Sequence, residues 1–115
     1  MRRQEALLLD MLIAARKVAS YTRELAWDQF AKDSVVQDAV MRQVQIIGEA
    51  AGRITNETRV SHPEIEWSQM IGMRHRLVHD YFQIIPERVW DAVQNDIAPL
   101  IVALQTVVPP DEGDD

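Results

Sequence analysis

The chain has 115 residues, of which 47% are hydrophobic, and a formal net charge of −6. This length gives one domain with a single hydrophobic core, at the small end of what is stable without a partner subunit. Four acidic residues lie in the last five positions, so the rest of the chain carries a charge of only about −2, and global charge does not exclude a nucleic-acid ligand.

The sequence also bears on the cellular compartment. The absence of cysteine excludes disulfides, thiolate metal sites and a cysteine nucleophile, and fits a reducing environment. No apolar run approaches the roughly 20 residues that a membrane span needs, and the N-terminus lacks the apolar segment of a signal peptide. We therefore expect a cytoplasmic protein with no membrane contact.

Two helical segments are predicted at the start of the chain. Residues 5–21 carry apolar side chains at helical spacing and should contribute to the core. Residues 22–31 predict a short helix or an ordered turn, with Thr22 as a candidate N-cap. Trp27 in this segment fits either the core or an exposed contact for a partner.

A long central helix should follow. Asp33 or Ser34 can cap it, and its apolar pattern continues to about residue 55. Residues 56–66 are polar and predict a loop, with Pro63 near the first turn of the next helix.

Two glycines in the central helix, Gly48 and Gly52, flank Glu49. Because glycine costs about 1 kcal/mol in a helix interior, the pair predicts the close approach of another helix. Glu49 is either solvated or a carboxylate partner for Arg74, and the sequence leaves both open.

Arginine and histidine gather in residues 71–82, IGMRHRLVHDYF, which read as the second half of a helix that starts near Trp67. Arg74 falls within the apolar face of this helix. Since an unpaired buried charge costs several kcal/mol, the guanidinium must meet an anion, a carboxylate or a wet cleft. His79 lies roughly 140° around the helix from Arg74. The two can cooperate only if the helix loosens between them or a neighbouring subunit supplies half of the site.

The last helix should begin at about Pro86, a favoured first-turn position, and Pro99 should kink it. Residues 109–115 predict a disordered acidic tail after a single domain formed by residues 1–108. The expected fold is all-α: an up-and-down bundle of four main helices with one additional short helix.

Arg74, His79 and Tyr81 form the pattern R-x4-H-x-Y. Three further stretches accompany it in order and spacing: IIGEAAGRI at 46–54, HPEIEW at 62–67 and VWDAVQNDI at 89–97. With them the sequence resembles, over nearly its whole length, the HepT-like branch of the HEPN superfamily, a group of small bacterial and archaeal toxins. His75 departs from the family, which usually has Asn there. The resemblance implies a two-fold homodimer with the motif at the subunit interface, and RNA, either tRNA or mRNA, as the substrate.

The motif residues suit RNA cleavage without a metal ion. RNA carries its own nucleophile, the 2′-hydroxyl, so the protein must supply a proton acceptor, a cation and a proton for the leaving 5′-oxygen. His79 can transfer protons near neutral pH, and Arg74 can clamp phosphate oxygens. A dimer supplies His79 twice. His75 and Arg76 are candidates for steering phosphate, although solvated roles fit equally.

The resemblance also implies a partner, an MntA-like nucleotidyltransferase antitoxin that transfers AMP to Tyr81. We expect no cofactor, because the chain lacks a glycine-rich phosphate loop. We expect no metal site, because His75 and His79 lack the Glu of the H-E-x-x-H pattern and a third ligand. The alternative function is a non-catalytic HEPN-type helical module that binds a nucleotidyltransferase or a nucleotide.

Overall fold

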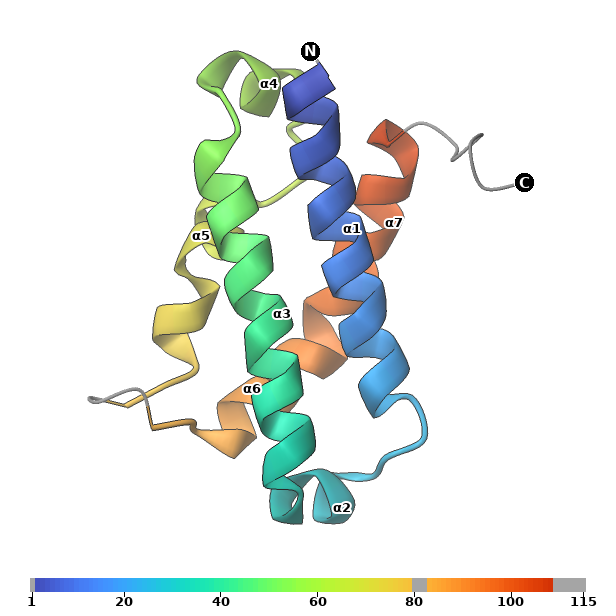
Figure 1. The fold of residues 1–115 in the computed structure, drawn as a ribbon, viewed down its shortest axis with the longest axis vertical. Coiled ribbons are helices and arrows are strands. Elements are labelled where there is room, and N and C mark those ends of the chain that lie inside the picture. Colours follow the sequence, from blue (N-terminus) through green and yellow to red (C-terminus); the bar gives the residue numbers. More distant parts are fainter. Residues whose placement is uncertain (1, 80–82, 109–115) are drawn as a thin grey trace.

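The computed structural model describes residues 2–79 and 83–108, and within these ranges the chain forms seven helices and no strand (Figure 1). They are α1 (Arg2–Thr22), α2 (Trp27–Lys32), α3 (Ser34–Arg53), α4 (Asn56–Ser61), α5 (Trp67–Arg76), α6 (Pro86–Asn95) and α7 (Ile97–Val107). The all-α prediction is confirmed. The predicted acidic tail, residues 109–115, and Tyr81 lie outside the described residues. No described helix is both long and apolar enough to cross a membrane.

The long helices alternate in direction. In Figure 1, α1 descends, α3 ascends beside it, α5 descends along the outer side of α3, and α6 and α7 return upward behind them. Helix α1 packs against α3 and α7, and α3 packs against α5. The short helices α2 and α4 lie at opposite ends of the bundle. This arrangement leaves α5 at one edge, in contact with α3.

The core forms where the apolar faces of the long helices meet. Its largest fully buried side chains are Phe30, Met11, Ile47, Met73, Leu104, Val18, Val40, Val44 and Val89. At the α2 end, the ring centroids of Phe30 and Trp90 lie 5.1 Å apart, and Trp27 lies 6.4 and 6.3 Å from them respectively. Trp27 is therefore a half-buried part of the core.

The start of α2 differs from the prediction, whereas the cap of α3 is confirmed. Thr22 does not cap a second helix: it is the last residue of α1, and its hydroxyl donates to the Val18 carbonyl at 2.9 Å. Helix α2 begins five residues later, at Trp27, with Ala26 at its N-cap position. Asp33 is the N-cap of α3, and its carboxylate accepts from the Val36 N–H at 3.0 Å.

The loop predicted for residues 56–66 is wrong in its first half. Asn56–Ser61 form α4, which Thr55 caps by accepting from the Thr58 N–H at 3.2 Å. Pro63 lies in the turn ahead of α5 and not in the first turn of that helix. With this cap, six residues, five of them polar, form a short helix that has no buried residue of its own.

Side-chain donors fix α5 relative to α3 through α4. The Trp67 indole, at the start of α5, donates to the carbonyls of Arg59 and His62 at 3.2 and 3.1 Å. The Arg59 guanidinium donates in turn to the Ala51 carbonyl near the end of α3, at 3.1 Å. These bonds anchor the first turn of α5.

Pro86 starts α6 at its first turn, as predicted. The kink expected at Pro99 is a full break, because α6 ends at Asn95 and α7 begins at Ile97. Pro99 has no N–H to donate to the carbonyl of Asn95, four residues earlier, and its ring crowds that carbonyl. Helix α6 therefore ends before Pro99, with Asp96 as its C-cap. The Asp96 N–H donates to the Ala92 carbonyl at 2.8 Å.

Candidate active site

Helix α5 ends between the two residues of the motif. It stops at Arg76, so the prediction that the helix continues to Phe82 is wrong beyond that residue. The Leu77 N–H donates to the Arg74 carbonyl at 3.2 Å, which closes the last turn. The helix therefore ends between Arg74 and His79, and His79 lies beyond its end.

Two backbone bonds reverse the chain after α5. The Ile85 N–H donates to the Leu77 carbonyl at 2.9 Å, and the His79 N–H donates to the Gln83 carbonyl at 2.6 Å. Val78 and Ile84 form an isolated antiparallel bridge between these bonds, and both pack against the core. Apolar contacts thus hold the chain on both sides of residues 80–82, and His79 is exposed.

The carboxyl end of α5 is also held by α6. The Arg88 guanidinium donates to the Arg76 carbonyl at 3.3 Å, which satisfies one of the carbonyls that have no partner within the helix. The Arg76 guanidinium turns back along α5 and donates to the Gln69 carbonyl at 3.3 Å.

Arg74 lies in a groove of about 350 Å³ between α3 and α5. Its lining residues are Gln45, Gly48 and Glu49 from α3, and Ile71, Arg74 and His75 from α5. Arg74 is half-buried and Glu49 is exposed. The guanidinium is therefore not sealed in the core, and the groove gives it the access to water that a charge on this face requires.

Gly48 lies where the backbones of α3 and α5 come close together. A Cβ at Gly48 would lie 3.4 Å from the Met70 carbonyl oxygen and 3.6 Å from that of Ile71. Close approach is confirmed at this position. It is wrong for Gly52, where a Cβ would have no atom within 4 Å.

This difference predicts opposite effects of leucine at the two glycines. Gly52→Leu should raise the free energy of unfolding by roughly 0.5–1 kcal/mol, because leucine is the better helix former. Gly48→Leu should lower it by about 1–3 kcal/mol, since the added side chain must push α5 away from α3. Urea unfolding of both variants checks this, and equal midpoints would contradict the assigned contact.

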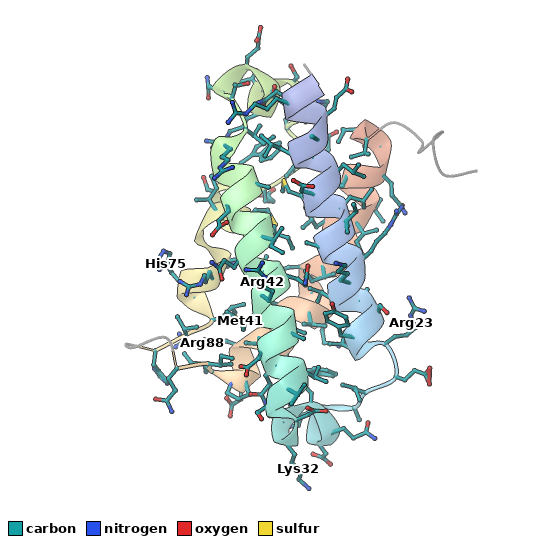
Figure 2. The ribbon with its side chains drawn as sticks, viewed as in Figure 1. Arg23, Lys32, Met41, Arg42, His75 and Arg88 are labelled. Carbon is teal, nitrogen blue, oxygen red and sulfur yellow. The ribbon has the colours of Figure 1, made fainter. Side chains whose placement is uncertain are left out.

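The structure brings in one groove residue that the sequence reasoning missed. The Gln45 side-chain amide donates to Glu49 Oε1 at 3.0 Å, which joins the two side chains on one face of α3. Their i, i+4 spacing is the signal that could have identified the pair. His75 extends from α5 at the edge of the bundle, where it is exposed (Figure 2).

The remaining candidates lie apart from this groove. Arg76 lines a separate cleft of about 450 Å³ at the end of α5 against α6, together with Arg88 and with Glu87, Asp91 and Asp96. The structure thus groups His75 with Arg74, but not Arg76. Among residues 2–79 and 83–108, no three His, Asp or Glu side chains gather closely enough to hold a metal ion.

Comparison with known proteins identifies the family. A family model described as "Ribonuclease HepT-like" matches residues 11–107. The chain is 39% identical over 93 residues to "Probable ribonuclease HepT" of Thermococcus cleftensis. The aligned residues cover 81% of this chain and 84% of the relative. It is 32% identical over 110 residues to "Putative RNase MJ0127" of Methanocaldococcus jannaschii, which covers 96% of this chain and 91% of the relative. No solved structure matches the chain significantly. Because the matched residues run from the middle of α1 to the end of α7, the chain belongs to the HepT-like ribonuclease family of the HEPN superfamily.

Proposed function

We propose that this protein is the toxin of a toxin–antitoxin system and acts as a metal-independent endoribonuclease, with Arg74 and His79 as its catalytic residues. The observation that carries the proposal is the end of α5 at Arg76: His79 lies beyond the helix and is exposed, while Arg74 lines an open groove. The family supports RNA as the substrate. The RNA cleaved in the cell is a tRNA or an mRNA.

Each step of the proposed reaction has a group to perform it. His79 accepts the proton of the 2′-hydroxyl as that oxygen attacks phosphorus. Arg74 binds the phosphate oxygens, whose negative charge grows in the transition state. The bond from phosphorus to the 5′-oxygen breaks, and this oxygen takes a proton from a second imidazole. The products are a 2′,3′-cyclic phosphate and a 5′-hydroxyl.

The second imidazole is His79 of another subunit in a two-fold homodimer. One chain supplies a single His79. A two-fold axis beside the groove brings His79 of the second subunit to the same site. Ile71 supports this arrangement, since it is an apolar groove residue that is 38% exposed in the single chain.

The purified protein should cleave RNA in the presence of a strong chelator and leave 2′,3′-cyclic phosphate ends. Gel analysis of an end-labelled RNA, with and without treatment that removes the terminal phosphate, checks both points. Activity that is lost with chelator and restored by a divalent cation would contradict metal independence. RNA that stays intact alongside a tight complex with a nucleotidyltransferase would favour the non-catalytic module.

We further propose that an MntA-like nucleotidyltransferase antitoxin silences the enzyme by transferring AMP to Tyr81. Tyr81 is two residues from His79 in the sequence, so a bulky, negatively charged nucleotide there would obstruct RNA and repel its phosphates.

Tyr81→Phe should keep full ribonuclease activity and accept no AMP. The other tyrosine, Tyr21 on α1, is 37% exposed and provides the matched control, because Tyr21→Phe should be modified as readily as the natural chain. Mass spectrometry after incubation with the antitoxin and ATP measures both. AMP on the Tyr81→Phe variant would show that the acceptor is elsewhere.

A further inference from the structure

We propose that the groove between α3 and α5 is a base-recognition site and that it selects guanine. The guanine belongs to a nucleotide whose phosphate Arg74 contacts, so its place next to the cleaved bond rests on the proposed ribonuclease function. The base preference itself follows from the side chains in the groove and can be measured without cleavage.

The hydrogen bond between Gln45 and Glu49 sets the order of donors and acceptors. The Gln45 amide nitrogen carries two hydrogens, and one of them is directed at Glu49 Oε1 at 3.0 Å. Its second hydrogen therefore lies beside a carboxylate, whose two oxygens only accept. Both residues line the groove, so in the proposed site the free Gln45 N–H is the donor and the two Glu49 oxygens beside it are the acceptors.

Guanine alone among the four bases complements this order. Its Watson–Crick edge offers the O6 acceptor, then the N1–H donor, then the 2-amino donor, and proteins read unpaired bases on this edge. Uracil would place its O2 acceptor against the carboxylate. Cytosine offers one donor and two acceptors, and adenine presents the N1 acceptor beside its amino group. An acceptor placed against the carboxylate, whose oxygens only accept, gains no hydrogen bond and meets like negative charge, so these bases should bind more weakly.

The rest of the groove suits a nucleotide. Gly48 adds no side chain to the floor, and the volume of about 350 Å³ lies in the range of small-molecule sites. The exposed imidazole of His75 is an aromatic ring on which the base can stack. Arg74 in the same groove provides the contact for the phosphate.

The test measures binding of 3′-GMP, 3′-AMP, 3′-CMP, 3′-UMP and 3′-IMP to the full chain by calorimetry. A bidentate base contact should make 3′-GMP bind about tenfold more tightly than the nucleotides of adenine, cytosine and uracil. 3′-IMP, which lacks the 2-amino group, should bind with intermediate affinity. Equal affinities, a preference for another base, or no binding of 3′-GMP at millimolar concentration would overturn the proposal.

Two variants tie the preference to the groove. Glu49→Gln keeps the shape but replaces one acceptor by a donor, and should reduce the preference for 3′-GMP to less than twofold. Glu5→Gln makes the same change at an exposed site on α1 and should leave the preference intact. An unchanged preference in Glu49→Gln would contradict the assigned contact.

Cleavage assays separate this proposal from the ribonuclease function. RNA oligonucleotides that differ at one position should be cut preferentially beside guanine. Cleavage without a base preference would sustain the ribonuclease and overturn the guanine site. Selective binding of 3′-GMP by a protein that cuts no RNA would sustain the guanine site and overturn the ribonuclease function.

Discussion

Replacing His79 by alanine is expected to lower the rate of RNA cleavage by about 100- to 10,000-fold, the range that general acid–base catalysis contributes. His79 is exposed, and its backbone N–H rather than its side chain is bonded to Gln83 in the turn after α5. Alanine keeps that backbone bond. The loss should therefore be a loss of proton transfer, measured as the single-turnover rate on one labelled RNA with chelator present.

The matched control is His62→Ala. His62 is half-buried between α4 and α5, and its backbone carbonyl, which alanine retains, accepts from Trp67. This variant should cleave RNA at close to the natural rate, and both variants should show a cooperative thermal unfolding transition. A folded His79→Ala protein that cuts RNA at the natural rate would exclude His79 as a proton-transfer group and would leave the non-catalytic module as the better hypothesis.

The end of α5 shows why the sequence predicted the site only in part. Leu77 and Val78 continue the apolar spacing that begins at Trp67, so the pattern favours a longer helix. Periodicity reports which side chains face the core, and both residues do pack there. Beyond the helix, however, the Leu77 carbonyl accepts from the Ile85 N–H. Its donor lies eight residues further along the chain, where a local pattern cannot indicate it.

Two signals that depend on one residue were confirmed. The carboxylate of Asp33 caps α3, and Pro86 starts α6, because each acts on backbone groups within a few residues. Gly48 and Gly52 look alike in sequence, yet only Gly48 meets the backbone of α5. That difference depends on which side of α3 faces its neighbour, and so on the packing of the whole bundle.

The pair formed by Gln45 and Glu49 falls between these cases. Its spacing was visible in the sequence, but such pairs are common on solvated helix faces. The groove identifies the pair as part of a candidate binding site, because α5 places Arg74 and His75 opposite it. The candidate binding site could therefore be recognised only from the position of α5. The side-chain hydrogen bonds of Trp67 and Arg59 fix that position.

Arg74→Ala is expected to lower kcat for RNA cleavage by about 100- to 1,000-fold, the usual effect of removing one group that stabilises transition-state charge. Arg74 is half-buried, and a charge partly removed from water acts more strongly on a nearby phosphate than an exposed one. Arg74→Lys keeps the charge but loses the two-pronged guanidinium, so it should recover only part of the rate. Steady-state kinetics on one RNA measures all three proteins.

The split between kcat and KM decides what Arg74 does. If its bonds to the phosphate strengthen only as charge develops, kcat falls while KM changes little; a rise in KM alone would make Arg74 a binding residue. Arg23→Ala is the control for a general loss of positive charge, since Arg23 is exposed on the side of the molecule opposite α5 (Figure 2). Equal losses in Arg23→Ala and Arg74→Ala would mean that the arginines attract RNA without a specific phosphate contact. A loss confined to Arg74 places the reacting phosphate at the groove between α3 and α5.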